Sequence, residues 1–138
     1  RLYRFGFGQK MGPPILILTT TGRKSGLPRE TPLQYEVIDG VYYAGSMRGD
    51  QADWYRNILA NPRVSIRVGK DEMPALAEVI DDPDRVLDFV KYRLERSPRM
   101  IATIMRADGL ASTAEADLRR YAAGLTIVAL RPVGEQDQ

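Results

Sequence analysis

Residues 18–33 read LTTTGRKSGLPRETPL and join two stretches of the chain that have the composition of β-strands. Two glycines bracket Arg23, Lys24 and Ser25, and Arg29 follows shortly after. Glycine permits positive φ angles and close backbone approach, which expose successive N–H groups to an anion. Arginine grips phosphate oxygens bidentately, while lysine adds a compact charge. The loop is therefore typical of a phosphate site, although a basic turn on a solvent-exposed hairpin has the same composition.

The segments on either side of this loop predict β-structure. Ile15–Thr20 is an apolar, β-branched run and is expected to form a buried strand. Thr31–Ile38 and Val41–Ser46 flank Asp39-Gly40, and an Asp-Gly pair between two β-rich runs is a strong hairpin signal.

A helix and a second strand pair are expected next. Asp50 can cap a helix over Gln51–Ala60, which Asn61-Pro62 would end. The apolar stripe of that helix is expected to comprise Trp54, Tyr55, Ile58 and Leu59. Apolar and polar residues alternate over residues 63–68, which indicates a half-buried strand that pairs with Met73–Ile80.

The pattern then changes to three helices. Asp82-Pro83 has a capping residue before a proline at the first helical position, and this helix is expected to end near Ser97-Pro98. A second helix would run from there to Gly109. Ser112-x-x-Glu115 has the form of a capping box that opens a third helix, which Gly124 would end.

Leu125–Arg131 is expected to return as a last strand. Five or six strands thus mostly precede a helical section, which predicts an α+β fold with an antiparallel sheet or small barrel covered by helices. We expect one domain over residues 1–138, and the alternating βαβ order of a doubly wound nucleotide fold is not present.

Two absences from the sequence restrict the chemistry. The chain has no cysteine, which excludes thiolate nucleophiles and disulfides, and no histidine, which excludes Ser-His-Asp hydrolysis and His-held metal. The acidic residues near Asp82 suit a helix N-terminus and lack the spacing of calcium or magnesium ligands, so no metal site is expected. These exclusions favour an enzyme that relies on a bound cofactor.

The distribution of charge points to an anionic partner. The net charge is +2, but residues 1–31 contain six lysines and arginines against one glutamate. A basic front of this kind favours anions. Neither a signal peptide nor a transmembrane segment is visible in the sequence, so a cytoplasmic protein without integral membrane contact is expected.

The motif over Leu18–Leu33 resembles the signature of the deazaflavin-dependent nitroreductase family. A second element with family-like order follows, from Ala44–Gly49 through Asp53–Ile58 to Asn61-Pro62. The resemblance covers about two fifths of the chain and implies a split β-barrel that binds coenzyme F420, a 5-deazaflavin with a phosphodiester and an oligoglutamate tail. It also allows a homodimer, since split-barrel relatives are often dimers.

The resemblance also implies which residues bind the cofactor. The phosphate would be held by Arg23, Lys24, Ser25, Gly26 and Arg29. The ring system would be lined by Pro32, Gln34, Ser46, Met47, Arg48 and Gly49, with Trp54 and Asn57 close behind. The glutamate carboxylates would meet Lys10, Arg4 or Arg1.

The chain departs from the family pattern at two positions of the motif. Arg48 stands before Gly49 where members usually have Gly-Gly, and Asp53 stands before Trp54 where a proline is common. Arg48 could contact the phosphate or tail of the cofactor, or change the specificity of the site.

A reduced deazaflavin delivers hydride, so the protein would lay the ring flat, exclude water and place an acceptor within reach. The resemblance implies a small organic acceptor of nitro, quinone or enone type. Ser46 is the first candidate for polarising it, and it can equally serve only to cap the turn. A buried tyrosine could do the same work, and the sequence selects none.

Three alternatives remain open from the sequence. FMN would need only the central loop, whereas F420 would also use the basic front. A non-catalytic protein that holds F420 or a fatty acid would use the apolar helical segment from Val86 to Met105. A nucleic-acid role would need stacking aromatics among the cations, of which only Tyr3, Phe5 and Phe7 give a hint, so no nucleic-acid partner is expected.

Overall fold

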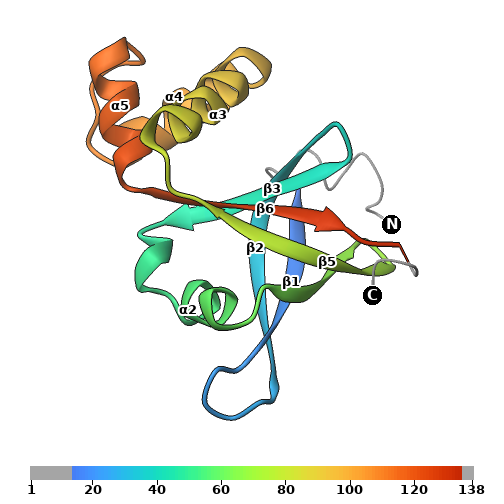
Figure 1. The fold of residues 1–138 in the computed structure, drawn as a ribbon. Coiled ribbons are helices and arrows are strands. Elements are labelled where there is room, and N and C mark those ends of the chain that lie inside the picture. Colours follow the sequence, from blue (N-terminus) through green and yellow to red (C-terminus); the bar gives the residue numbers. More distant parts are fainter. Residues whose placement is uncertain (1–13, 135–138) are drawn as a thin grey trace.

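A computed structural model describes residues 14–134 as a six-stranded antiparallel β-barrel with a helical cap (Figure 1). The strands are β1 (Ile15–Thr21), β2 (Pro28–Ile38), β3 (Val41–Met47), β4 (Arg63–Val68), β5 (Asp71–Ile80) and β6 (Leu125–Pro132). The barrel closes in the order β1-β2-β3-β6-β5-β4. The α+β class and the small antiparallel barrel predicted from the sequence are confirmed. The basic residues Arg1, Arg4 and Lys10 and the aromatic residues before Pro14 lie outside the described residues.

β1 is half-buried rather than buried throughout. Leu16, Leu18 and Thr20 point into the barrel, whereas Ile15 is 56% exposed. The strand lies in a single-layered barrel wall, where successive side chains point to opposite faces. The expectation of a fully buried strand was therefore wrong for alternate positions.

β2 is divided between two neighbours, and this division opens the barrel. Residues 28–34 pair with β1, whereas residues 34–38 pair with β3, so only Gln34 belongs to both ladders. Beyond Gly45, β3 continues against β6 and leaves the first half of β2. Pro32, which lacks an N–H donor, lies in the half of β2 that has one partner strand, where proline is tolerated. The barrel is thus split between β2 and β3.

The turn between β2 and β3 confirms the predicted hairpin. Asp39 and Gly40 both have left-handed φ angles, 52° and 81°. Positive φ at both central residues gives a turn whose twist matches the flanking strands. The predicted pairing of β4 with β5 is also confirmed, with Val64 opposite Ala75.

The helix after β3 begins later than the sequence indicated. A 3-10 turn, η1 (Gly49–Gln51), precedes α2 (Asp53–Ala60), and Ala52 takes the N-cap position. Asp50 therefore lies inside the turn and does not cap α2. Its main-chain N–H donates to Thr126 Oγ1 at 2.9 Å. The helix ends before Asn61, as predicted.

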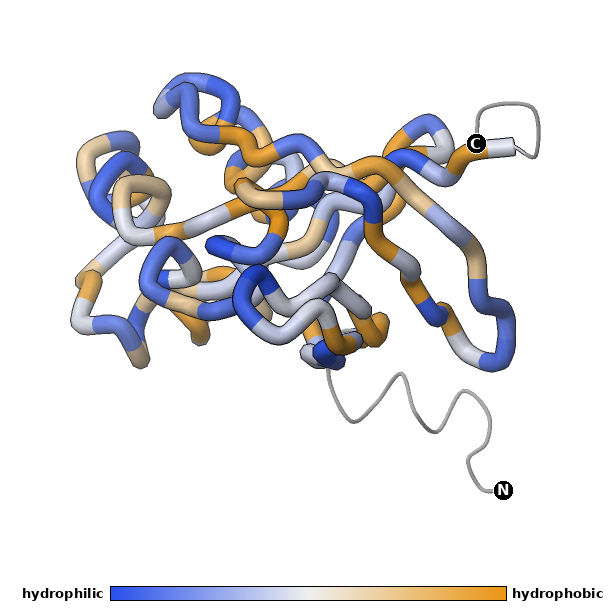
Figure 2. The backbone as a smooth tube through the Cα atoms, turned by 60° about the horizontal axis from the view of Figure 1, so that its bottom comes forward, coloured by the Kyte–Doolittle hydropathy of each residue, from blue (hydrophilic) through white to orange (hydrophobic). Residues whose placement is uncertain are grey.

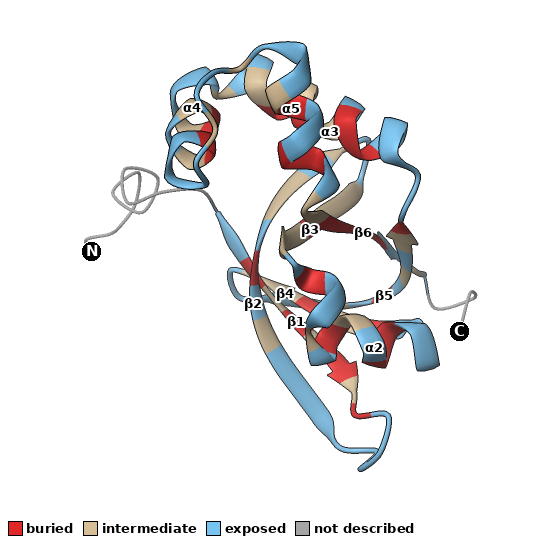
Figure 3. Ribbon diagram, turned by 90° about the vertical axis from the view of Figure 1, so that its left-hand side faces the viewer, coloured by how far each residue is buried: buried red, intermediate tan, exposed pale blue. Residues whose placement is uncertain are grey.

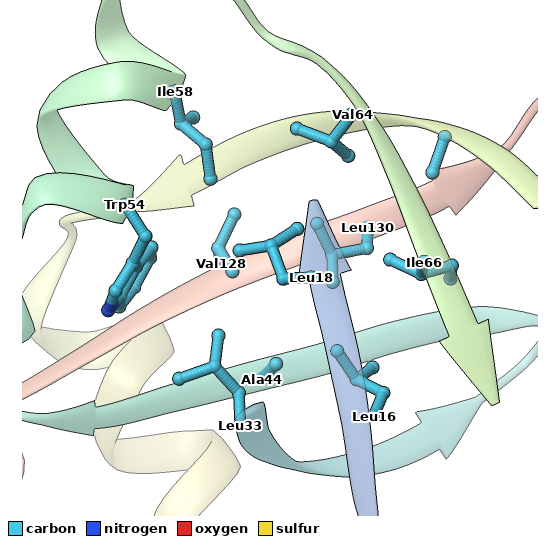
Figure 4. Packing of buried hydrophobic residues seen from close by; sticks show 11 residues of the cluster. Leu16, Leu18, Leu33, Ala44, Trp54, Ile58, Val64, Ile66, Val128 and Leu130 are labelled. Atoms are coloured by element: carbon cyan, nitrogen blue, oxygen red, sulfur yellow. The ribbon is translucent and has the colours of Figure 1, made fainter. Parts of the chain in front are cut away.

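α2 packs across one end of the barrel. Trp54 and Ile58 point toward Leu18 and Val128 in the barrel interior (Figure 4). Leu59, which was expected on the same apolar stripe, is 61% exposed. The stripe is narrower than predicted because α2 meets the barrel along a single row of side chains.

Three helices form a cap on the outer side of the barrel, near the point where β3 ends and β6 begins (Figure 1). They are α3 (Pro83–Arg96), α4 (Pro98–Ala107) and α5 (Glu115–Ala123). Asp82 caps α3 as predicted, accepting the Asp84 N–H at 3.0 Å. The expected capping box at Ser112 and Glu115 does not form. Ser112 instead donates through its N–H and hydroxyl to Asp117, and α5 starts at Glu115.

The buried residues form two cores that share β6. Val128 and Leu130 belong to the barrel core (Figure 4), whereas Ile127 and Ala129 belong to the core between the barrel and the cap. Both faces of this strand are therefore buried. Figure 2 shows hydrophobic and hydrophilic residues alternating along the strands, with hydrophilic residues gathered at the turns and on the cap helices. None of the described helices is both long and apolar enough to cross a membrane.

Candidate functional site

The loop between β1 and β2 is held by its own main chain. Gly22 N donates to Leu27 O and Gly26 N donates to Gly22 O, each at 2.8 Å. Gly26 has a φ of +74°, a conformation that residues with a Cβ rarely adopt. Ser25 Oγ accepts the N–H of Leu27 at 3.1 Å. Among the described residues nothing accepts the main-chain N–H groups of Lys24 and Ser25, so both donors remain for a ligand.

Helix α2 fixes Arg23, the second residue of this loop. Asn57, which is 2% exposed, accepts two hydrogen bonds from Arg23, one from the main-chain N–H and one from Nη1. Arg23 Nη2 also lies 3.2 Å from Asp53 Oδ1. The guanidinium is therefore oriented by two residues of α2, and its side chain keeps 26% exposure.

A cleft of about 480 Å³ lies between the loop and α2, which we name the loop cleft. Its lining brings together six of the residues predicted to bind cofactor, namely Arg23, Lys24, Ser25, Arg29, Trp54 and Asn57. Two carboxylates, Glu30 and Asp53, lie in the same lining. Among the described residues, Lys24 and Arg29 form no ion pair, so their charges are available to an anion.

A second cleft, of about 380 Å³, lies where β2 and β3 separate, and we name it the split cleft. It is lined by four more of the predicted residues, Pro32, Gln34, Ser46 and Met47. Residues 29–31 of β2 line the loop cleft and residues 32–34 line the split cleft, so the two follow each other along one strand. Figure 3 shows β2 running from its exposed end near the loop toward the cap.

Arg48 lies apart from the other predicted residues. It lines a different cleft, together with Asp50, Tyr55 and residues 122–126, and its φ is +55°. The Arg48 N–H donates to Gly124 O at 2.8 Å, which anchors the left-handed turn to the end of α5. A ligand in the split cleft would therefore have to extend around this turn to reach Arg48.

Gly49 supports the site from behind. It is buried, and a Cβ at this position would lie 2.8 Å from Trp54 Cζ2 and 2.9 Å from Ser46 Oγ. The absence of a side chain thus lets Trp54 pack against the turn that presents Ser46.

The cap contributes two residues to the split cleft that sequence reasoning did not select, Arg93 and Tyr121. The side chain of Arg93 is 9% exposed, and its Nε lies 3.5 Å from Glu36 Oε2. Its Nε and Nη2 are buried without a hydrogen-bond partner among the described residues. The available signal was that Arg93 falls on the same helical face as Val86 and Val90, where an arginine is exceptional.

Tyr121 is a buried tyrosine near Arg93 whose hydroxyl can donate a proton. Burial raises the pKa of its phenol above the usual value, and the nearby charge of Arg93 opposes that rise. The hydroxyl makes no hydrogen bond with any described residue. It therefore stays protonated at neutral pH and can donate to an oxygen that enters the split cleft.

The chain is similar to known proteins in both sequence and fold. The sequence model of a family described as F420H(2)-dependent quinone reductase matches residues 4–108. An F420H(2)-dependent quinone reductase of Mycobacterium tuberculosis is 40% identical over 87 residues, which are 59% of this chain and 58% of that protein. The match thus spans less than two thirds of the relative.

Two solved structures have a similar fold. One is an F420-H2-dependent reductase with 27% identity and a TM-score of 0.56, in a match that covers 86% of this chain and 94% of that one. The other is a domain-swapped dimer with 25% identity and a TM-score of 0.57, covering 86% and 80%. The cofactor of the matched family is coenzyme F420, and its members are oxidoreductases of the split-barrel type.

Proposed function

The chain belongs to the F420H(2)-dependent quinone reductase family, and from this premise we propose that it binds reduced F420 along β2 and transfers hydride to a small quinone-type acceptor. The observation that supports this most directly is the sequence of two clefts on one strand. The loop cleft is basic and polar, whereas the split cleft is mainly apolar. An elongated cofactor with an anionic arm and a flat ring needs a basic cleft for the arm, followed by an apolar cleft for the ring.

The residues of the loop cleft fit a phosphodiester. Lys24 and Arg29 offer charges without ion pairs among the described residues, and the free N–H groups of Lys24 and Ser25 point to the same ligand type. Arg23 is positioned by Asn57 and Asp53 and can contribute one edge of its guanidinium. In this proposal Gly26 maintains the loop conformation and does not itself bind.

The residues of the split cleft fit a planar conjugated ring. Pro32 and Met47 provide apolar walls on the two separated strands, and Gln34 and Ser46 add polar groups. Arg93 also lines this cleft, and its guanidinium charge would favour a ring that presents oxygen atoms at its edge.

The reduced deazaflavin supplies hydride when bound. The acceptor must also gain a proton, and among the described residues Tyr121 and Ser46 supply the two hydroxyl groups of the split-cleft lining. Ile104 of α4 and Leu125 of β6 add apolar surface, which would limit the access of water to a bound ring. Nitro and enone compounds remain further candidates for the acceptor within the same proposal.

FMN is the principal alternative cofactor, because its single phosphate arm would also fit the loop cleft. A non-catalytic protein that holds F420 or a fatty acid is the second alternative. Its signature would be ligand binding without turnover of any acceptor.

The test is a fluorescence titration of the full chain with F420 and, separately, with FMN. The double variant Lys24→Ala with Arg29→Ala should lose F420 affinity by at least about 100-fold, since two charge-assisted contacts disappear. The matched control is Lys70→Ala, which removes an exposed lysine in the turn between β4 and β5. Tighter binding of FMN than of F420 would replace the cofactor, and failure to bind either would end the catalytic proposal.

The same premise leads us to propose a homodimer, supported by the domain-swapped dimer among the similar structures. Sedimentation equilibrium of the full chain would test this. A mass of one chain at all concentrations up to about 100 µM would contradict it.

A further inference from the structure

Arg93 is the most unusual buried group among the described residues. It lies on the inward face of α3 with Val86 and Val90, and its side chain is only 9% exposed. A buried guanidinium normally has its donors satisfied, because an unpaired buried charge is strongly destabilising. Here Nε and Nη2 have no hydrogen bond with any described residue.

Glu36, the one carboxylate that pairs with Arg93 in the described part of the chain, satisfies the charge incompletely. Glu36 Oε2 lies 3.5 Å from Arg93 Nε, which is an ion pair without hydrogen-bond geometry. Phe89 lies beneath the guanidinium, with 5.9 Å from Cζ to the ring centroid, and can give no lone pair. Glu36 thus orients the arginine without forming a hydrogen bond to it. Nε and Nη2 are enclosed by the protein, so a ligand in the split cleft would meet only the part of the guanidinium that lines the cleft.

The position of Arg93 identifies the ligand. Arg93 and Tyr121, whose hydroxyl bonds to no described residue, both line the split cleft together with Gln34 and Ser46. A planar guanidinium and a phenol in a mainly apolar cleft recognise an oxygen at the edge of a flat ring. Their charge and donor set favour an oxygen that is negative, as a conjugated carbonyl becomes when the ring is reduced or enolised.

We propose that Arg93, aligned by Glu36, binds a negatively charged or enolate oxygen of the conjugated ring in the split cleft, and so determines which ring systems the site accepts. Two rings carry this chemistry, the acceptor and the deazaflavin. The inference rests on the proposed function for the identity of the rings, but the anion site itself can be tested without cofactor.

The test measures, by calorimetry, the binding of two naphthoquinone probes to the full chain. 2-Hydroxy-1,4-naphthoquinone is an enolate at neutral pH, and 2-methoxy-1,4-naphthoquinone is its neutral counterpart. The wild type should bind the enolate at least about tenfold more tightly, which corresponds to about 1.4 kcal/mol. The variant Arg93→Met combined with Glu36→Gln removes both charges together and should reduce this preference to about one.

Two further variants separate the charge from the packing. Arg93→Lys should retain part of the preference, because the charge remains and the fork of donors is lost. Glu36→Gln alone removes the competing negative charge and keeps a side chain of the same size beside Arg93, so the preference for the enolate should at least be retained. Thermal unfolding of each variant monitors the fold, and the ratio of the two affinities is insensitive to a uniform loss of packing.

A second arm distinguishes the two rings. Oxidised F420 is titrated into the wild type and into the Arg93→Met, Glu36→Gln variant. Weaker F420 binding by the variant assigns the oxygen to the deazaflavin, whereas loss of the enolate preference alone assigns it to the acceptor. Unchanged behaviour in both arms, or a wild type that binds neither probe nor F420, would overturn the inference. A wild type that fails to bind F420 but prefers the enolate would retain the Arg93 site and reject the proposed cofactor.

Discussion

Asn57 and Arg23, which are 34 residues apart in the sequence, are joined twice, because Asn57 Oδ1 accepts both the main-chain N–H of Arg23 at 3.1 Å and its Nη1 at 2.9 Å. The same amide donates through Nδ2 to Thr20 Oγ1 at 3.1 Å. One buried side chain of α2 thus secures the end of β1, the start of the loop and the direction of a cation.

Replacing this amide should weaken both the fold and the loop. Asn57→Ala leaves two donors of Arg23 and the hydroxyl of Thr20 without their partner, so we expect a loss of about 2–3 kcal/mol in the free energy of unfolding. Urea denaturation measures it. Asn61→Ala is the matched control, because Asn61 Oδ1 accepts a single exposed hydrogen bond from Arg63 N and should contribute less than about 1 kcal/mol. Equal losses in the two variants would contradict this assignment.

Asp53 should oppose the binding of an anion in the loop cleft. Its carboxylate is 79% exposed and lies 3.2 Å from Arg23 Nη2, where it competes with a phosphate for the same donor. Asp53→Asn is expected to tighten F420 binding by about 2- to 5-fold at low salt, with an unfolding free energy changed by less than about 0.5 kcal/mol. Titrations at low and high salt measure the effect, which should shrink as salt screens it. Asp71→Asn, at an exposed turn, should leave the affinity unchanged, and weaker binding by Asp53→Asn would refute the competition.

Two glycines of the β3 region should differ in their tolerance of alanine. A Cβ on Gly45 would overlap the carbonyl oxygen of Thr126 on the paired strand, whereas a Cβ on Gly49 would meet the side-chain atoms Ser46 Oγ and Trp54 Cζ2. Backbone cannot move without breaking the ladder, but a serine hydroxyl can rotate. We expect Gly45→Ala to lose about 3 kcal/mol or more and Gly49→Ala about 1–2 kcal/mol in chemical denaturation. A larger loss of unfolding free energy for Gly49→Ala than for Gly45→Ala would contradict this expectation.

The carboxylate of Glu78 should make stability depend on acid pH. The hydrogen bond from Arg131, at 2.7 Å, and a further one from Arg85 lower the pKa of Glu78. Because the folded pKa lies below the unfolded one, the stabilisation is present above the unfolded pKa of about 4.3 and is lost as the pH falls through the folded pKa. Solvent screens this half-exposed group, so the contribution should stay below about 1 kcal/mol.

The check is the difference in unfolding free energy between wild type and Glu78→Gln at pH 7 and at pH 3. The wild type should be more stable than the variant at pH 7, and the difference should be smaller at pH 3. Glu95→Gln, at an exposed position of α3, serves as the control and should have no effect at either pH. A difference that grows on acidification would reverse the assigned sign.

Local signals in the sequence were sufficient for most of the fold. Asp39-Gly40, Asp82-Pro83 and Asn61-Pro62 each mark a boundary where the structure has one. Ser112 was misassigned as a cap because its hydroxyl donates to Asp117. Asp50 was misassigned because the chain forms a 3-10 turn there, in which the Asp50 main-chain N–H bonds to Thr126 Oγ1. Capping propensity cannot anticipate a partner that only the folded barrel brings near.

The part of the candidate site that is continuous in sequence was predictable. The part that tertiary packing brings together was not. The loop from Gly22 to Arg29 is one continuous motif, so its clustering in a single cleft follows from the sequence. Arg93 and Tyr121 reach the split cleft only through the packing of α3 and α5 on β6. Their alignment depends on the register and crossing of the helices, which no local pattern encodes. The binding roles of all these residues remain predictions.

The alternation of β6 between two cores bears on how this protein can diversify. Val128 and Leu130 face the barrel, while Ile127 and Ala129 face the cap. Selection on neighbouring residues of β6 therefore acts through different cores. Mutations can rebuild the cap helices and alternate residues of β6 in one lineage while the opposite residues preserve the barrel and its basic loop. Substitutions on the cap side of β6 can therefore accumulate without a change in the barrel core, and substitutions on the barrel side can accumulate without a change under the cap.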